Sequence, residues 1–143
     1  MLSDDVMVIP RVDVPAIYEI EEGGKKHVLG EHRDFSRHPV LKGAIPDNAR
    51  LGISWATLAP SQVLEPHLHP ILSMIIVCRG NGALLGDKTG PLSEGDVVVV
   101  PAGRLHGFVG GDPEGLTVLS VQFEMRGLYE DTNNALVNFA AED

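Results

Sequence analysis

Apolar and polar residues alternate along the central part of the chain in a way that predicts β-strands. Residues 51–58 alternate so that one face is strongly apolar, and residues 116–125 alternate again. Such a period of two places successive side chains on opposite faces of a strand. Residues 71–78 are apolar on both faces, and residues 97–100 are four valines followed by a proline. Short strands of this kind, separated by turns, are typical of an all-β barrel or sandwich.

The glycine and proline content strengthens this prediction. The chain has 16 glycines and 10 prolines, which together make 26 of 143 residues or about 18%, against roughly 12% in average usage. These residues are spread along the chain, so they indicate many turns and not one disordered tract. Glycine and proline at this frequency would interrupt the helices of a helix-rich fold.

The pattern divides the chain into three parts. Residues 1–50 predict an arm of short strands and loops packed on the barrel, and residues 51–126 predict the barrel itself. Residues 127–143 form a tail in which apolar positions over 132–141 predict a short helix. Because residues 71–78 are apolar on both faces, the face turned away from the barrel interior needs a cover, either the arm or a second subunit.

Charge and cysteine content exclude several classes of protein. Acidic residues number 20 against 11 basic ones, which gives a net charge of −9 and makes nucleic acid and anionic membranes poor partners. A single cysteine, Cys78, excludes an internal disulfide framework. The acidic N-terminal stretch is broken by Pro10 and does not resemble a signal peptide. The apolar run 71–78 is far shorter than the ~20 residues of a membrane helix. We therefore expect a soluble, cytoplasmic protein.

Three histidines carry the candidate chemistry. His67 and His69 are two residues apart, so on an extended strand both imidazoles point to the same face. His106 follows the valine strand and a tight turn. Three converging neutral imidazoles with open coordination positions describe a catalytic metal site better than a closed structural one. The other histidines, expected to be solvated side chains of the arm, are His27, His32 and His38.

The spacing of these residues resembles two motifs of the cupin family. The first motif contains His-x-His and a later glycine, and the second contains a glycine, then Pro-x-Gly, then a histidine. The matching residues are His67, His69, Gly80, Gly95, Pro101, Gly103 and His106. The resemblance covers residues 60–110 closely and 51–126 in strand pattern. It implies a small antiparallel jelly-roll β-barrel with a metal ion inside, commonly as a homodimer.

The sequence departs from the motifs at one position that bears on the chemistry. The glutamate ligand of the first cupin motif falls on Ser73, or on Met74 in the longer spacing variant, and Gly110 replaces the asparagine of the second. The chain thus resembles three-histidine cupins such as thiol dioxygenases and the acetylacetone-cleaving enzyme. Without a carboxylate ligand a divalent ion keeps its full charge, which favours an anionic bidentate substrate.

Further site candidates follow from strand parity and from nearness to the motifs. The candidate substrate-pocket residues are Trp55, Ser73, Phe108 and Gln122. Ser73 and Arg104 are the candidates for a catalytic role. Glu65 has the same strand parity as His67 and is an alternative source of the missing carboxylate. The polar face that carries Gln122 is of a kind that usually meets solvent.

The favoured function is a three-histidine non-haem Fe(II) dioxygenase acting on a small anionic chelator, which is an enolate, thiolate or carboxylate. One divalent transition metal ion per chain is expected, with Zn, Ni, Mn or Cu as alternatives to Fe(II). A second hypothesis is a non-redox isomerase, cyclase, lyase or decarboxylase that uses Zn, Ni or Mn. A third is a non-catalytic module that binds a small ligand or metal. The resemblance implies a homodimer, and no nucleic-acid or membrane partner is expected.

Overall fold

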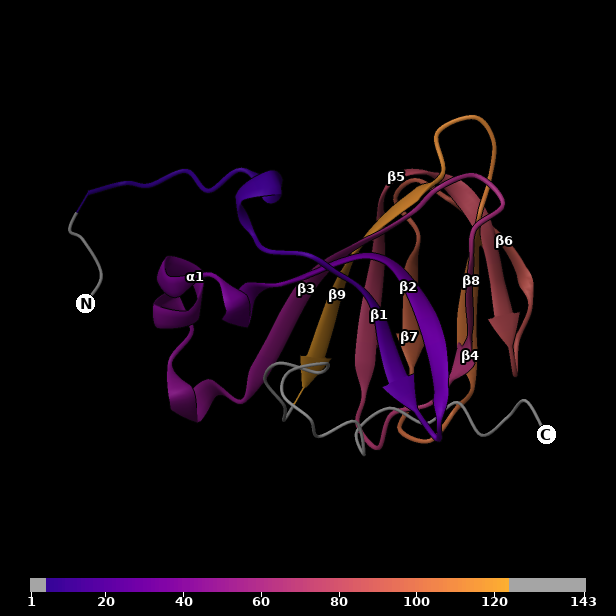
Figure 1. Ribbon diagram of the computed structural model, residues 1–143, viewed down its shortest axis with the longest axis horizontal. Helices are drawn as coiled ribbons and strands as arrows, with labels where there is room; N and C mark the ends of the chain where they lie inside the picture. The colour runs from indigo at the N-terminus through magenta and orange to yellow at the C-terminus, as the bar shows by residue number, and fades with distance from the viewer. Residues whose placement is uncertain (1–4, 124–143) are drawn as a thin grey trace.

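The computed structural model describes residues 5–123, which form a strand-rich barrel with a few short helices (Figure 1). The strands are β1 (Ile17–Glu22), β2 (Lys25–Asp34), β3 (Leu51–Leu58), β4 (Val63–His67), β5 (Ser73–Gly86), β6 (Gly90–Ser93), β7 (Val97–Val100), β8 (His106–Gly110) and β9 (Leu116–Phe123). Within residues 5–123 the helices are the 3-10 turns η1 (Arg11–Asp13), η2 (Phe35–Arg37) and η3 (Asp47–Ala49) and one α-helix, α1 (Pro39–Ala44). The all-β prediction is confirmed.

The strands pair antiparallel in the order β1-β2-β3-β9-β5-β8-β4, and β6 and β7 also pair with β5. The long strand β5 joins the two halves of the barrel, because its first half pairs with β7 and β9 and its second half with β6 and β8. The change of partner occurs at Gly80, whose φ is +79°. A β-carbon there would collide with the carbonyl oxygen of Gly115, so glycine is required for the two segments to approach.

The interior of the barrel is built from one face of each strand. On β3 the interior face carries Gly52, Ser54 and Leu58, which are buried. Trp55 lies on the opposite face, where the guanidinium of Arg11 lies 5.9 Å from its ring centroid. The strongly apolar face predicted for residues 51–58 is therefore the outer face. Alternation identifies two faces of a strand but not which of them turns inward.

The described part of the N-terminal segment, residues 5–50, supplies two strands of the sheet. β1 and β2 belong to the same sheet as β3, with Asp34 opposite Ser54 and His32 opposite Ala56. The expectation of solvated histidines is wrong for two of three, because His27 and His32 are 2% and 5% exposed. The helix predicted over residues 132–141 lies outside the described residues. Among those that are described, no helix is long and apolar enough to span a membrane.

Candidate metal centre

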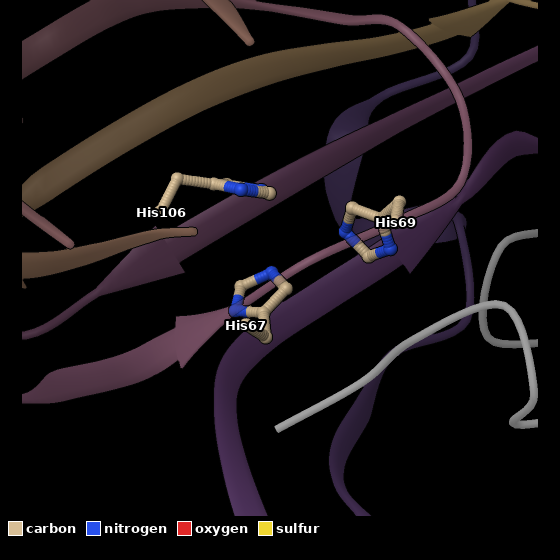
Figure 2. A group of neighbouring side chains, drawn as sticks. All are labelled: His67, His69 and His106. Atoms are coloured by element: carbon tan, nitrogen blue, oxygen red, sulfur yellow. The ribbon is translucent and has the colours of Figure 1, made fainter. Parts of the chain in front are cut away.

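Three histidines, from β4, from the segment that follows it and from β8, face one another inside the barrel (Figure 2). His67 ends β4 and lies directly opposite His106, the first residue of β8. Their ring centroids are 4.4 Å apart. His69 follows β4, and its ring centroid lies 4.9 Å from that of His67 and 5.2 Å from that of His106. The structure thus brings together all three histidines that the sequence predicted to form a metal site.

Backbone groups hold these imidazoles in place. Nδ1 of His67 lies 2.8 Å from the carbonyl oxygen of Glu65, and Nδ1 of His106 lies 3.1 Å from that of Arg104. A carbonyl oxygen only accepts, so each Nδ1 donates and each Nε2 is left with its lone pair. The amide of Gly103 donates to the carbonyl of His69 at 2.8 Å, which ties the Pro-x-Gly turn to the third histidine.

The cluster favours neutral imidazoles. Burial lowers the pKa of His67 well below its usual value, and His106 and His69 lower it further because a second positive charge nearby is unfavourable. Burial also lowers the pKa of His106, against the opposing effect of its hydrogen bond to Arg104. Neutral imidazole is the form that binds a metal ion.

The residues present fit a divalent transition metal. One ligand nitrogen from each histidine lies within 4.8 Å of the other two, and all three residues are buried. Ser73, at the position of the missing glutamate, is 1% exposed, and its Oγ has no hydrogen-bond partner. A hydroxyl buried without a partner costs free energy, which is expected beside a site that takes a ligand.

The structure places the remaining candidates in different surroundings. Phe108 is buried with its ring centroid 6.2 Å from that of His106, and Gln122 is 3% exposed; both line the cavity beside the cluster. Trp55 is on the outer face of β3, as described above. The side chain of Arg104 is 62% exposed and donates to Asp87 at 2.8 Å, which lowers the pKa of Asp87. Only the backbone carbonyl of Arg104 reaches the site.

Glu65 is not brought to the histidine cluster. Its carboxylate accepts a hydrogen bond from Nδ1 of His27 at 2.8 Å, and its side chain is 53% exposed. The pairing of β4 with β8 shifts register between Leu64 and His67. This irregularity breaks the parity that predicted a common face for Glu65 and His67.

The cavity beside the histidines is lined mainly by apolar side chains. Its walls are formed by Leu29, His32, Ala56, Leu58, Leu64, His67, His69, Ile75, His106, Phe108, Leu116, Val118, Ser120 and Gln122. Sequence reasoning missed Ser120 and His32. The shared parity of Ser120 and Gln122 was available as a signal, but it was interpreted as a solvent-facing surface. No signal in the sequence distinguishes His32 from an exposed loop histidine.

Comparisons with known proteins agree with this architecture. Residues 54–122 match the family model described as Cupin domain. The chain is similar to the polyketide cyclase RemF from Streptomyces resistomycificus, with a TM-score of 0.65 and 24% identity over 86% of this chain and 82% of that one. It is also similar to a Cupin 2 conserved barrel domain protein from Salinispora arenicola, with a TM-score of 0.63 and 21% identity over 84% and 90% of the two chains. No curated protein matches the chain. At these identities the solved structures show the shared fold.

Proposed function

The chain is a cupin-domain protein with three buried, clustered histidines, and on that premise we propose that it is a metal-dependent enzyme. The reaction we propose is that of a three-histidine non-haem Fe(II) dioxygenase, which acts on a small anionic chelating substrate. Incorporation of both atoms of O2 into an enolate substrate requires no external reductant. The location we propose is the cytoplasm.

The observation that carries the proposal is a ligand set without a carboxylate. Among the described residues, the cluster that offers metal ligands contains histidines alone, and Glu65 is engaged by His27. Three neutral imidazoles leave the charge of a divalent ion uncompensated, which favours an anionic chelator. When bound, such an ion supplies Lewis acidity at open coordination positions, and Fe(II) adds reactivity toward O2.

The residues around the cluster have roles of their own in this proposal. The hydrogen bonds to the carbonyls of Glu65 and Arg104 keep the Nε2 lone pairs of His67 and His106 aimed at one point. Apolar walls that include Phe108 exclude water from the bound substrate and strengthen its electrostatic attraction to the site. Gln122 offers an amide to the substrate on the neighbouring wall.

Metal analysis combined with O2 uptake tests the proposal. Protein purified without a tag is analysed for bound metal, loaded anaerobically with Fe(II), and mixed with a panel of diketones and thiols. We expect one ion per chain and substrate-dependent O2 consumption. Stoichiometric metal with no O2 uptake and no turnover would contradict the enzyme proposal and favour a binding module.

A non-redox cyclase or lyase is the second candidate. The mainly apolar lining of the cavity favours it, since apolar side chains contact a carbon skeleton during rearrangement. The similar fold of a polyketide cyclase is compatible with this alternative. Turnover of a panel substrate by the Zn or Ni form under anaerobic conditions would select it over the dioxygenase.

We also propose that the protein is a homodimer. Val97 and Val99 on the outer face of β7 are 52% and 58% exposed, and they lie opposite Ile76 and Met74 of β5. A second copy covering this apolar outer face would remove it from water. Light scattering should give the dimer mass, and a Val97→Lys, Val99→Lys double variant should be monomeric. A monomeric wild-type protein would contradict the proposal.

A further inference from the structure

A row of uncharged polar side chains crosses the interior wall formed by β3, β9 and β5. We propose that this polar row, defined as Ser54, Ser73, Ser120 and Gln122, binds a further, uncharged oxygen group of the substrate, a carbonyl or hydroxyl, that does not itself chelate the metal. The inference rests on the proposed function, because it specifies the class of substrate that the same cavity takes.

Strand register places the four side chains together. Ser54 on β3 lies opposite Ser120 on β9, and Gln122 on β9 lies opposite Ser73 on β5. Ser120 and Gln122 share one face of β9 because they are two residues apart. Both of them line the cavity that also holds the three histidines. Ser120 and Gln122 therefore form part of a second wall of the metal cavity, and Ser54 and Ser73 lie next to them on the same face of the sheet.

The hydrogen bonds of the row are incomplete. Nε2 of Gln122 donates to Oγ of Ser120, so the hydroxyl hydrogen of Ser120 is directed to a different acceptor. Ser54 and Ser73 are each 1% exposed, yet the Oγ atom of neither has a hydrogen-bond partner. Buried polar groups are nearly always paired in folded proteins, and an unpaired one is destabilising. A ligand oxygen supplies the acceptor that these hydroxyls lack.

The absence of charge on the polar row indicates which kind of substrate oxygen it binds. The four side chains of the row are neutral and supply no cation to balance a carboxylate. On the neighbouring strand β2, the residue paired with Ser54 is Asp34. Its Oδ1 already accepts from the amide and the hydroxyl of Ser36, at 2.8 and 2.6 Å. Neither the polar row nor Asp34 brings a positive charge to a substrate carboxylate, whereas a carbonyl or hydroxyl needs none.

The substrate class that fits both walls is a chelating anion that continues into a further neutral oxygen function. An enolised dicarbonyl with an additional carbonyl has this composition. The chelating end matches the histidine cluster, the added oxygen matches the polar row, and the carbon chain matches the apolar remainder of the cavity, which includes Leu29, Leu58 and Val118.

Two probes that differ by one carbonyl test the inference. Zn-loaded, full-length protein is titrated by calorimetry with acetylacetone and with diacetylacetone, which carries one further carbonyl. In the wild type we expect diacetylacetone to bind more tightly. Ser54→Ala, Ser120→Ala and Gln122→Leu should each weaken diacetylacetone about three- to tenfold, the range of one lost hydrogen bond. Acetylacetone, which reaches only the metal, should change less than about twofold in the same variants. Ser93→Ala, at an exposed position of β6, is the matched control.

Thermal unfolding without ligand separates ligand binding from a structural role. Because Oγ of Ser54 has no partner, Ser54→Ala should leave the Tm unchanged or raise it. A lower Tm together with unchanged affinity for diacetylacetone would overturn the inference, and so would equal weakening of both probes. If the wild type binds acetylacetone but does not prefer diacetylacetone, the inference fails and the proposed function stands. If the wild type takes up no metal, the proposed function itself fails.

Discussion

Two walls of one cavity differ in how their polar groups are held. On the β4 and β8 side, His67 and His106 each donate to a backbone carbonyl, and the carbonyl of His69 is bonded to the turn at Gly103. On the β3, β9 and β5 side, Ser54 and Ser73 have hydroxyls with no partner. The imidazoles on the β4 and β8 side are therefore oriented before a ligand binds. The hydroxyls on the β3, β9 and β5 side still have unused hydrogen-bonding groups.

The difference follows from what each wall is proposed to bind. A metal ion requires three nitrogens directed at one point, and hydrogen bonds to the far side of the His67 and His106 rings provide that orientation for two of them. A substrate brings its own donors and acceptors, so the wall that receives it keeps unused groups until it arrives. The unsatisfied hydroxyls lower stability, which is a common cost of a functional site.

The largest expected effect comes from removing a histidine of the first wall. His106→Ala should lower metal affinity by more than about a hundredfold, beyond the loss typical of groups that only orient a ligand. Metal content after dialysis measures this. His38→Ala is the matched control, since His38 caps α1 away from the cluster. A His106→Ala protein that retains one ion per chain would show that the metal site is assigned wrongly.

Ser73→Glu should convert the site to the usual cupin ligand set. The added carboxylate lowers the charge of the loaded site by one and takes a coordination position from the substrate. Metal affinity should hold or rise, while an anionic chelator such as acetylacetone should lose about 1–3 kcal/mol of binding free energy. Ser73→Ala serves as the control. Unchanged chelator affinity in folded, metal-loaded Ser73→Glu would mean that residue 73 does not face the ion.

A smaller effect is expected from changes at Glu65, which links His27 to the histidine side of the cavity. His27 bonds to the carboxylate of Glu65, and the carbonyl of Glu65 orients His67. Glu65→Ala should therefore reduce metal affinity about tenfold without removing a ligand. Glu65→Gln should restore most of it, because an amide oxygen accepts the same hydrogen bond from His27. Equal affinities for the two variants would exclude this positioning role.

The smallest effect is a pH dependence of folding stability, which arises from histidines and not from the polar row. Burial, reinforced by the charge of Arg37, lowers the pKa of His32 to about 3 from 6.5. The unfolded chain takes up this proton below pH 6.5 and the folded chain does not, so stability is lost as pH falls from 6.5 toward 3. Between pH 6.5 and 5.5 the metal-free protein should lose about 1 kcal/mol through this histidine.

Chemical denaturation at several pH values measures this loss. His32→Phe should flatten the profile, while Ser120→Ala should leave its slope as in the wild type. An unchanged slope in His32→Phe would show that His32 does not carry the dependence.

The sequence by itself determined the fold class and the candidate metal ligands. The spacing of two placed His67 and His69 on one face, and the spacing of His106 after the Pro-x-Gly motif identified it as the third histidine. These relations are local or follow from short motifs. The strand alternation that predicted an all-β fold is local as well.

Only the tertiary structure decided which strand faces enclose the cavity. Alternation on β3 favoured Trp55 as an inward residue, yet pairing in register with β9 turns Ser54 inward. The polar face of β9 is likewise enclosed, because β3 and β5 flank it and the sheet curls around Gln122. The register shift in β4 separated Glu65 from His67. Each outcome depends on pairing between segments distant in sequence, and a strand's own pattern does not contain that information.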